Sequence, residues 1–297
     1  MMRGLRHWAV TIRRPDGGTE SMLAELAPHA ERMPLLKLPV FRGVLALWEA
    51  LSLAMKALSY SATMASDEDV EIGKGEVGFS MVLGVVLAVG LFIVLPAFAT
   101  NLFVRWIGHG VLWNVVDGVI RVGVFVAYLM VIGLVPDIRR VFEYHGAEHK
   151  TIHAFEHGVR LEPEEIQRFS TSHVRCGTSF LLIVMVLAIA VFSFITGALW
   201  VRIAARLLLI PLIAGLSYEV TKWAGRYEET PLVRVVMWPG LALQALTTRE
   251  PDDGQVEIAV ASLRQVVEAE AADEVASGEP GPSEPPPPQV TVDAPLI

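Results

Sequence analysis

The chain has 297 residues, of which 53% are hydrophobic, and its mean hydropathy is +0.48. This composition is too apolar for an ordinary soluble domain and predicts a membrane protein whose main partner is the lipid bilayer. The formal net charge of −8 arises in the tail, because seven acids and no lysine or arginine occur from Glu268 onward. The remainder is near neutral, so the charge indicates no nucleic-acid partner.

The N-terminal region, residues 1–34, is predicted to hold a small β-hairpin. Trp8–Ile12 is β-prone and Pro15–Gly18 has turn chemistry, so we expect the hairpin over residues 8–26. The same region has no uninterrupted apolar core, and no signal peptide is expected.

Residues 35–65 predict an amphipathic helix. The segment is apolar, but Arg42, Glu49 and Lys56 interrupt it at intervals of seven, about two helical turns. These charges would form one narrow polar stripe. We expect the helix to lie on the membrane surface or to pack against the helix bundle.

Four apolar segments are long enough to cross a hydrocarbon core, which needs roughly 20 residues. They are residues 79–100, 111–135, 179–200 and 203–221. Asp117 and Arg121 interrupt the second segment and, being four apart, are expected to pair on one face. The predicted fold class is therefore mainly α, a polytopic membrane protein with about four transmembrane helices, a small N-terminal hairpin and a cytoplasmic His-rich helix.

Lysine and arginine set the expected orientation. They are abundant in the N-terminal region, in the 136–178 loop and after residue 221, and rarer in the short connections between spans. Both termini and the 136–178 loop are therefore expected in the cytoplasm, with the chain crossing the membrane several times. Residues 222–269 form a cytoplasmic region with a helix expected from 254 to 269. Residues 270–297 are rich in Pro, Gly and Glu and are expected to be disordered.

The most informative feature is a series of histidines at positions 145, 149, 153 and 157, on a helix expected from 138 to 157 with Gly158 as its C-cap. The first two enclose Glu148 in the pattern H-x-x-E-H, which is that of the inverted zinc peptidases. On a helix, residues four apart share one face and can bind one metal ion, zinc or another divalent transition metal.

Two metal sites are possible on this helix. One uses His145 and His149, with Glu148 as general base, and the other uses His149, His153 and Glu156. Since one helix cannot supply a closed tetrahedral shell, another ligand is expected from elsewhere. His173 and Cys176, the only cysteine, are spaced H-x-x-C and are nearest in sequence; Glu219, at the end of the fourth span, is a further candidate.

Several functions are compatible with this pattern. A zinc-dependent hydrolase would use Glu148 to activate water, with Lys150 and Arg175 steadying an anionic group of the substrate. A non-enzymatic scaffold or assembly factor would use the metal structurally. A metal transporter is less consistent, because its ligands belong within the spans. A solvated or pH-sensitive histidine face without metal is the simplest alternative.

Several blocks together resemble one family, the YqhQ-like bacterial membrane proteins. The blocks, which keep their order over about residues 2–267, are Arg42-Gly43-Val44, Tyr60-Ser61-Ala62, Glu143–Lys150, Arg175–Phe180, Pro239-Gly240-Leu241 and Thr247–Asp253. The family is of unknown function and commonly described as metal-dependent enzymes. The resemblance implies functional roles for His145, Glu148, His149, Arg175 and Cys176, and for His173 in an HxRC-type stretch.

One departure concerns the start of the chain. Family members usually begin with a glycine-rich stretch that ends in a Val-Met-Met-Arg-like run, whereas this chain starts at Met1-Met2-Arg3. We expect either that the leading strand is absent or that the true start lies upstream.

Overall fold

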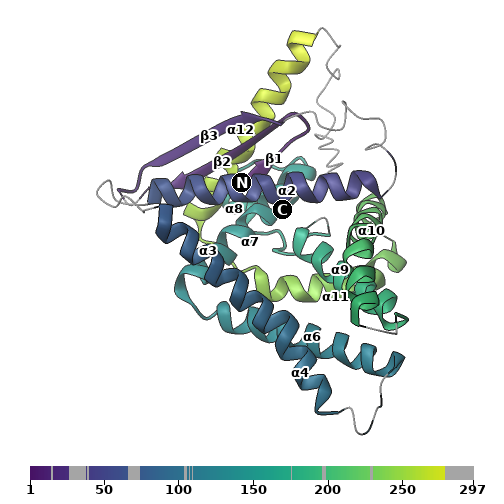
Figure 1. Cartoon of the computed structure of the whole chain (residues 1–297). Coiled ribbons are helices and arrows are strands. Elements are labelled where there is room, and N and C mark those ends of the chain that lie inside the picture. The colour runs from purple at the N-terminus through teal and green to yellow at the C-terminus, as the bar shows by residue number, and fades with distance from the viewer. Residues whose placement is uncertain are drawn as a thin grey trace.

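The computed structural model describes residues 1–14, 16–26, 38, 40–65, 74–103, 106, 108, 110–174, 176–195, 199–227 and 230–277. The chain is mainly helical, with a small three-stranded sheet (Figure 1). The strands are β1 (Met2–Arg3), β2 (His7–Arg13) and β3 (Thr19–Glu25). The helices are α2 (Phe41–Ala65), α3 (Lys74–Val89), the π-helical segment η2 (Gly90–Val94), α4 (Leu95–Asn101), α6 (Val111–Ile132), α7 (Pro136–Glu156), α8 (Pro163–Ile166), α9 (Gly177–Ser193), α10 (Leu199–Arg226), α11 (Pro231–Thr247) and α12 (Asp253–Ser277).

The predicted hairpin is present as the antiparallel pair β2–β3, and β1 adds a third strand that was not predicted. Strand β2 is buried on both faces, because different helices cover them. Ala9 packs with residues of α7 and α12, whereas Trp8 and Val10 pack against α2. The sheet therefore joins α2 to the core around α7 and α12.

Among the described residues, two helical segments are long and apolar enough to cross a membrane, Val82–Asn101 and Val111–Ile132. Only 6% and 11% of their most apolar windows are buried, whereas the core helices of a soluble protein are mostly buried. The first contains η2, just before Pro96; a π-helical turn there accommodates the proline, which lacks an N–H and crowds the preceding turn. The second carries the expected pair, with Arg121 Nη2 2.9 Å from Asp117 Oδ2.

The third and fourth predicted spans differ from the observed helices. Helix α9 ends at Ser193 rather than near residue 200. At this end of the helix, the side-chain amide of Asn114 donates to the carbonyls of Ser193 and Ile195. At 17 residues α9 is short for a span. The fourth segment lies inside the longer helix α10.

The C-terminal region also differs from expectation. Helix α11 has 17 residues and an apolar sequence, whereas the sequence pattern after Arg226 predicts only a short amphipathic piece within residues 222–269. Helix α12 runs to Ser277, so residues 270–277 are helical rather than disordered. Its Glu270 explains the extension, because the carboxylate accepts the backbone N–H groups of Arg6 and His7 at 2.7 and 2.9 Å. The rest of the predicted tail lies outside the described residues.

Glycines bring the helices close together. A Cβ on Gly43 of α2 would lie 2.9 Å from the Cα of Gly215 in α10, and one on Gly118 of α6 would lie 2.5 Å from Ile189 in α9. A Cβ on Gly240 of α11 would lie 2.8 Å from Ser179 at the start of α9. Small residues at such contacts are typical of helices that pack within membranes.

Candidate metal centre

Helix α7 positions the histidines. It starts at Pro136, whose fixed φ and missing N–H suit the first helical turn, and Gly158 follows it at φ +65°. One face, which includes Ala147, Ala154 and Phe155, is buried in the core with α12. The face bearing the histidines contacts the loop that precedes α9 and the C-terminal end of α11.

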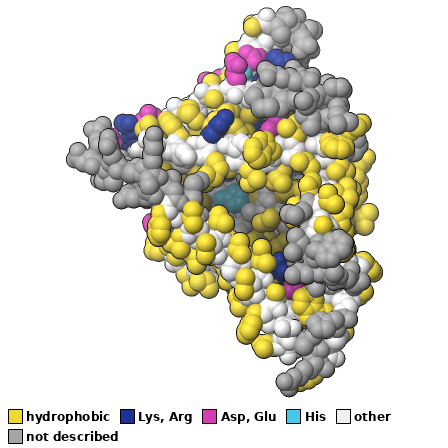
Figure 2. Space-filling model, viewed as in Figure 1, with side chains coloured by type: hydrophobic (Ala, Val, Ile, Leu, Met, Phe, Trp, Pro, Cys, Tyr) yellow, Lys and Arg dark blue, Asp and Glu magenta, His cyan; other side chains and the backbone are white. Residues whose placement is uncertain are grey.

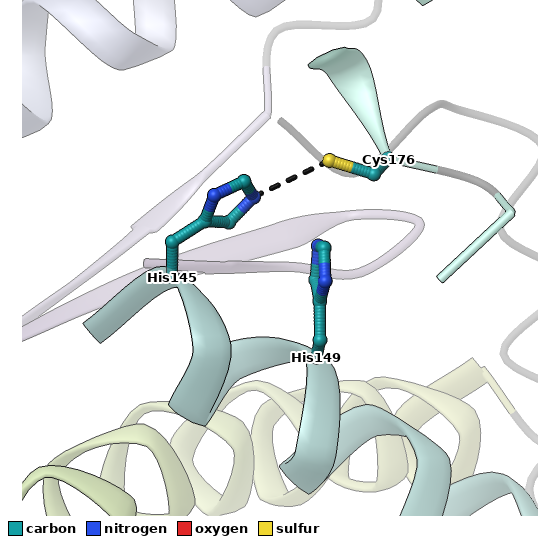
Figure 3. A group of neighbouring side chains, drawn as sticks. All are labelled: His145, His149 and Cys176. Carbon is teal, nitrogen blue, oxygen red and sulfur yellow. Dashed lines mark hydrogen bonds between the residues drawn. The ribbon is translucent and has the colours of Figure 1, made fainter. Parts of the chain in front are cut away.

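His145, His149 and Cys176 form the first group that could hold a metal ion, which we call group one (Figure 3). One ligand atom from each lies within 4.8 Å of the others, and His145 Nε2 is 3.3 Å from Cys176 Sγ. The two histidines come from adjacent turns of α7, and the cysteine is the N-cap of α9. The structure therefore brings together the H-x-x-E-H histidines and the cysteine of the H-x-x-C pair.

Backbone carbonyls set the tautomers of both histidines. His145 Nδ1 donates to the carbonyl of Thr247 at 2.9 Å, and His149 Nδ1 donates to that of Thr171 at 2.5 Å. Because a carbonyl only accepts, each Nδ1 carries a proton, which leaves Nε2 of each ring as the nitrogen on which a metal ion could replace a proton. Histidines that bind zinc are held in this way, with the second ring nitrogen bonded to a carbonyl or carboxylate.

The electrostatics of group one favour a thiolate. Burial lowers the pKa of His145, but its hydrogen bond to Cys176 and the nearby charges of Cys176 and Glu148 raise that pKa to about 9. Burial raises the pKa of the Cys176 thiol, but hydrogen bonds from His145 and His149 outweigh it and bring the pKa well below its usual value. The thiolate is the form of cysteine that binds metals.

A small cavity of about 20 Å³ adjoins group one, which is room for roughly one water molecule. Its lining includes Glu148, His149, His173 and Cys176. The carboxylate of Glu148 also receives the amino group of Met1. In Figure 2 a histidine side chain is visible in a hollow near the middle of one face, surrounded by hydrophobic side chains. Glu148 thus lies beside the possible metal position rather than within the ligand set.

His153, Glu156 and His173 form a second group, which we call group two. His173 Nε2 lies 3.2 Å from Glu156 Oε2, and His153 Nε2 donates to the carbonyl of Ser172 at 2.8 Å. Burial and the neighbouring His173 lower the pKa of His153 to about 4, so its ring is neutral near pH 7. The alternative second site had been expected to use His149, but the structure places His149 in group one and His173 in group two.

The other predicted site residues have different environments. Lys150 is buried, and its Nζ contacts the carbonyl of Gln167 at 2.8 Å and the carboxylate of Glu250 at 2.6 Å, so it connects α7 to neighbouring segments instead of facing the cavity. Glu219 pairs with Arg42 of α2, away from both groups. Arg175 lies outside the described residues.

Comparison with known proteins gives the family. The family model described as "Protein of unknown function (DUF1385)" matches residues 38–269. The chain is also 31% identical over 289 residues to the uncharacterized protein YqhQ of Bacillus subtilis (strain 168), covering 92% of this chain and 91% of that protein. The chain belongs to the YqhQ-like family. The resemblance seen in the sequence blocks is thereby confirmed. No solved structure matches the chain significantly.

Two features of the candidate metal centre in this YqhQ-like protein were not predicted. The carbonyls of Thr171, Ser172 and Thr247 orient the histidines, but any residue carries a carbonyl, so the sequence holds no signal for them. The side chain of Gln244 is fully buried and bonds both the N–H and the carbonyl of His173, at 2.8 and 2.7 Å. A glutamine in the apolar helix α11 was the available signal, since buried amides need partners.

Proposed function

We propose that this protein is a membrane-embedded, metal-dependent hydrolase that acts at the cytoplasmic face of the bacterial inner membrane. Zinc, or another divalent transition metal, would be held by His145, His149 and Cys176. The observation that carries the proposal is a three-ligand group beside a cavity whose lining includes a carboxylate outside that group, Glu148. Three protein ligands with an open fourth position are typical of catalytic zinc, whereas structural zinc has four.

The residues fit such an ion. Zinc–nitrogen and zinc–sulfur bonds of 2.0–2.1 and 2.3 Å at a tetrahedral angle separate the two donor atoms by about 3.6 Å. The observed 3.3 Å between His145 Nε2 and Cys176 Sγ is close to that value. Among the described residues, no fourth His, Cys, Asp or Glu joins group one. A bound zinc ion would supply a Lewis acid that makes water a nucleophile near neutral pH.

The residues of the chain then have distinct roles. His145 and His149 are oriented by the carbonyls of Thr247 and Thr171, and Cys176 supplies the anionic ligand. Glu148 accepts a proton from the attacking water in the cavity, the role of a general base. The small cavity and its buried lining keep bulk water from the reacting atoms.

The membrane location rests on the apolar helices. The segments Val82–Asn101 and Val111–Ile132 expose most of their side chains, as spans in contact with lipid would. In Figure 1 the sheet and α12 lie at one end of the molecule and α4 and α6 at the other, with α7 between them. Lysine and arginine favour the sheet, the 136–178 segment and both termini on the cytoplasmic side of a multi-pass protein.

The substitution Glu148→Gln tests the catalytic role. It keeps the size and hydrogen bonding of the side chain but removes the proton acceptor. We expect the zinc content and the midpoint of thermal unfolding to stay near those of wild type, while the variant fails to rescue the phenotype of a gene deletion. A general base typically contributes 10²–10⁴-fold in rate, enough to resemble a null allele. Elemental analysis and complementation measure the two effects.

The matched control is Glu164→Gln. Glu164 is an exposed glutamate that follows α7 in the sequence and belongs to neither group. This variant should keep both the metal and the rescue. Full rescue by Glu148→Gln would instead support the alternative function, a membrane scaffold or assembly factor. One observation favours that alternative: a metal in group one would join α7 to the start of α9, as a structural ion does. Loss of zinc in Glu148→Gln would make Glu148 part of the ligand set and contradict its role as base.

A further inference from the structure

Group two has the composition of a metal site in its own right. Two imidazoles and one carboxylate, from His153, His173 and Glu156, each place one ligand atom within 4.8 Å of the others. We propose that this group binds a second divalent first-row metal ion, independently of group one. The inference does not depend on the hydrolase function, because it concerns a different ligand set.

The three side chains converge from two segments of the chain. His153 and Glu156 lie one turn apart on α7, and His173 reaches them from the loop that precedes α9. The rings of His153 and His173 have centroids 4.5 Å apart, and Glu156 Oε2 is 3.2 Å from His173 Nε2. An ion pair between His173 and Glu156 would not require His153, whereas a metal site requires a third ligand of this kind.

Group two is shielded from solvent in part, and hydrogen bonds hold its residues in place. The His173 side chain is only 3% exposed and that of Glu156 19%, so neither is a freely solvated surface group. Gln244 holds the His173 backbone from both sides. The carbonyl of Ser172 accepts a hydrogen bond from Nε2–H of His153, so the lone pair of the neutral ring is on Nδ1. Ligands fixed in this way lose little entropy when a metal binds.

The two groups share no ligand but share a cavity. His149 of group one and His173 of group two have ring centroids 6.0 Å apart, and both line the cavity beside Glu148. A molecule in that cavity therefore contacts both groups. Their donors differ: the thiolate of group one favours zinc, whereas two imidazoles and a carboxylate also suit Fe²⁺ and Mn²⁺.

Titration of the full-length, detergent-solubilised protein with Co²⁺ after chelation tests the proposal. Cobalt is the probe because a thiolate ligand produces a charge-transfer band in the near ultraviolet that nitrogen and oxygen ligands do not. We expect two cobalt ions per chain, and only one of them should contribute to that band. Glu156→Gln and His153→Ala should each lower the stoichiometry from two to one and leave the band intact.

The matched variants separate the two groups. Cys176→Ser should remove the charge-transfer band and one ion but retain the other. His157→Ala should retain both, because His157 lies one turn beyond His153 on the same stretch yet belongs to neither group. Gel filtration and far-ultraviolet circular dichroism verify that each variant is folded.

Each remaining outcome decides between the two proposals. One cobalt per chain with a full thiolate band overturns the second site and leaves the proposed function standing. One cobalt without the band, lost in Glu156→Gln, supports the second site and contradicts group one as the hydrolytic centre. Loss of both ions in Glu156→Gln means that the groups bind metal jointly, which overturns the independent site. Absence of cobalt from folded wild type overturns both.

Discussion

At the residue scale, Gly146, the glycine within H-x-x-E-H, allows the backbone at Arg249 to lie close to α7 beside group one. A Cβ on Gly146 would lie 2.0 Å from the carbonyl oxygen of Arg249. The segment at that point crosses α7, because the N–H of Arg249 donates to the carbonyl of Phe142 at 2.9 Å. The same segment carries the Thr247 carbonyl that orients His145. Gly146 therefore links the local sequence pattern to the orientation of His145, a candidate metal ligand.

We predict that Gly146→Ala displaces the Arg249 segment and weakens metal binding. The added methyl group meets backbone rather than a flexible side chain, and overpacking of this kind costs about 1–3 kcal/mol of stability. Loss of the carbonyl behind a metal-bound histidine typically lowers metal affinity about 10–100-fold. Thermal unfolding and competition with a zinc chelator measure the two effects.

The control for this prediction is Gly84→Ala. Gly84 is also a helical glycine, but a Cβ there would meet no atom within 4 Å. This change should leave zinc affinity unaltered and should not lower stability, since alanine favours helix over glycine by roughly 1 kcal/mol. Equal zinc affinity of Gly146→Ala and wild type would refute the role given to the close approach.

At the element scale, α11 holds the loop that carries the non-helical ligands. Gln244 Nε2 donates to the carbonyl of His173 and contacts Ser179 Oγ at 2.6 Å, and its Oε1 accepts the His173 N–H. Gly240, one turn earlier, lets α11 approach α9 at Ser179. The position of His173, and of Cys176 three residues later, therefore depends on packing between α9 and α11.

We predict that Gln244→Leu lowers stability and weakens metal binding at both groups. The leucine fills similar space but leaves the N–H and carbonyl of His173 without the partner they have in wild type, at about 1–3 kcal/mol for each unsatisfied buried group. Gln265→Leu, a half-buried glutamine of α12, is the matched control and should change metal affinity little. Cobalt titration and thermal unfolding report the outcome; unchanged metal affinity in Gln244→Leu would show that the loop keeps its shape without the amide.

Helix α2 illustrates a second effect of packing. Ala50, Leu53 and Ala57 are buried, and the latter two pack against the sheet, while the opposite side exposes Trp48 and Leu51. Two charges of the predicted polar stripe are neutralised by tertiary partners, Arg42 by Glu219 of α10 and Glu49 by Arg3 of β1. The stripe thus contacts protein, and the exposed apolar side is the one suited to a membrane surface.

At the scale of the whole molecule, polar and apolar elements are separated. The sheet and α12 form a compact unit with α7, whereas α3, η2, α4 and α6 expose large apolar side chains. The histidine groups lie where α7 meets the bundle helices. In the function proposed above, this arrangement gives the hydrolytic centre access to substrates at the membrane boundary, and the proposed cytoplasmic orientation keeps Cys176 in a reducing compartment.

We predict that this polar unit faces the cytoplasm. A reporter inserted at Gly158, just after α7, and one fused at the C-terminus should both report the cytoplasm. A reporter inserted at Gly108, between α4 and α6, should report the exterior, because the two apolar segments on either side would then form a transmembrane hairpin. An exterior signal at Gly158 would contradict the topology and the argument for a reduced Cys176.

Much of the architecture could be predicted from local pattern. The hairpin, the apolar segments within residues 79–135 and the Asp117–Arg121 pair follow from turn residues, hydropathy and spacing. Segment ends were less predictable. Helix α9 stops where Asn114 of another helix binds its last carbonyls, and α12 continues because Glu270 binds the β1–β2 connection. Such ends depend on partners distant in sequence.

The candidate site likewise has a part that the sequence predicted and a part that it did not. By itself the sequence determined that His145 and His149 share one face and that Glu148 lies beside them, because helical periodicity is a local property. Only the tertiary structure decided that Cys176 joins these histidines while His173 joins His153 and Glu156. The H-x-x-C spacing lies in a loop, where no periodicity fixes side-chain direction. That direction is set instead by the amide of Gln244 and by the N-cap of α9, which hold His173 and Cys176 toward different turns of α7.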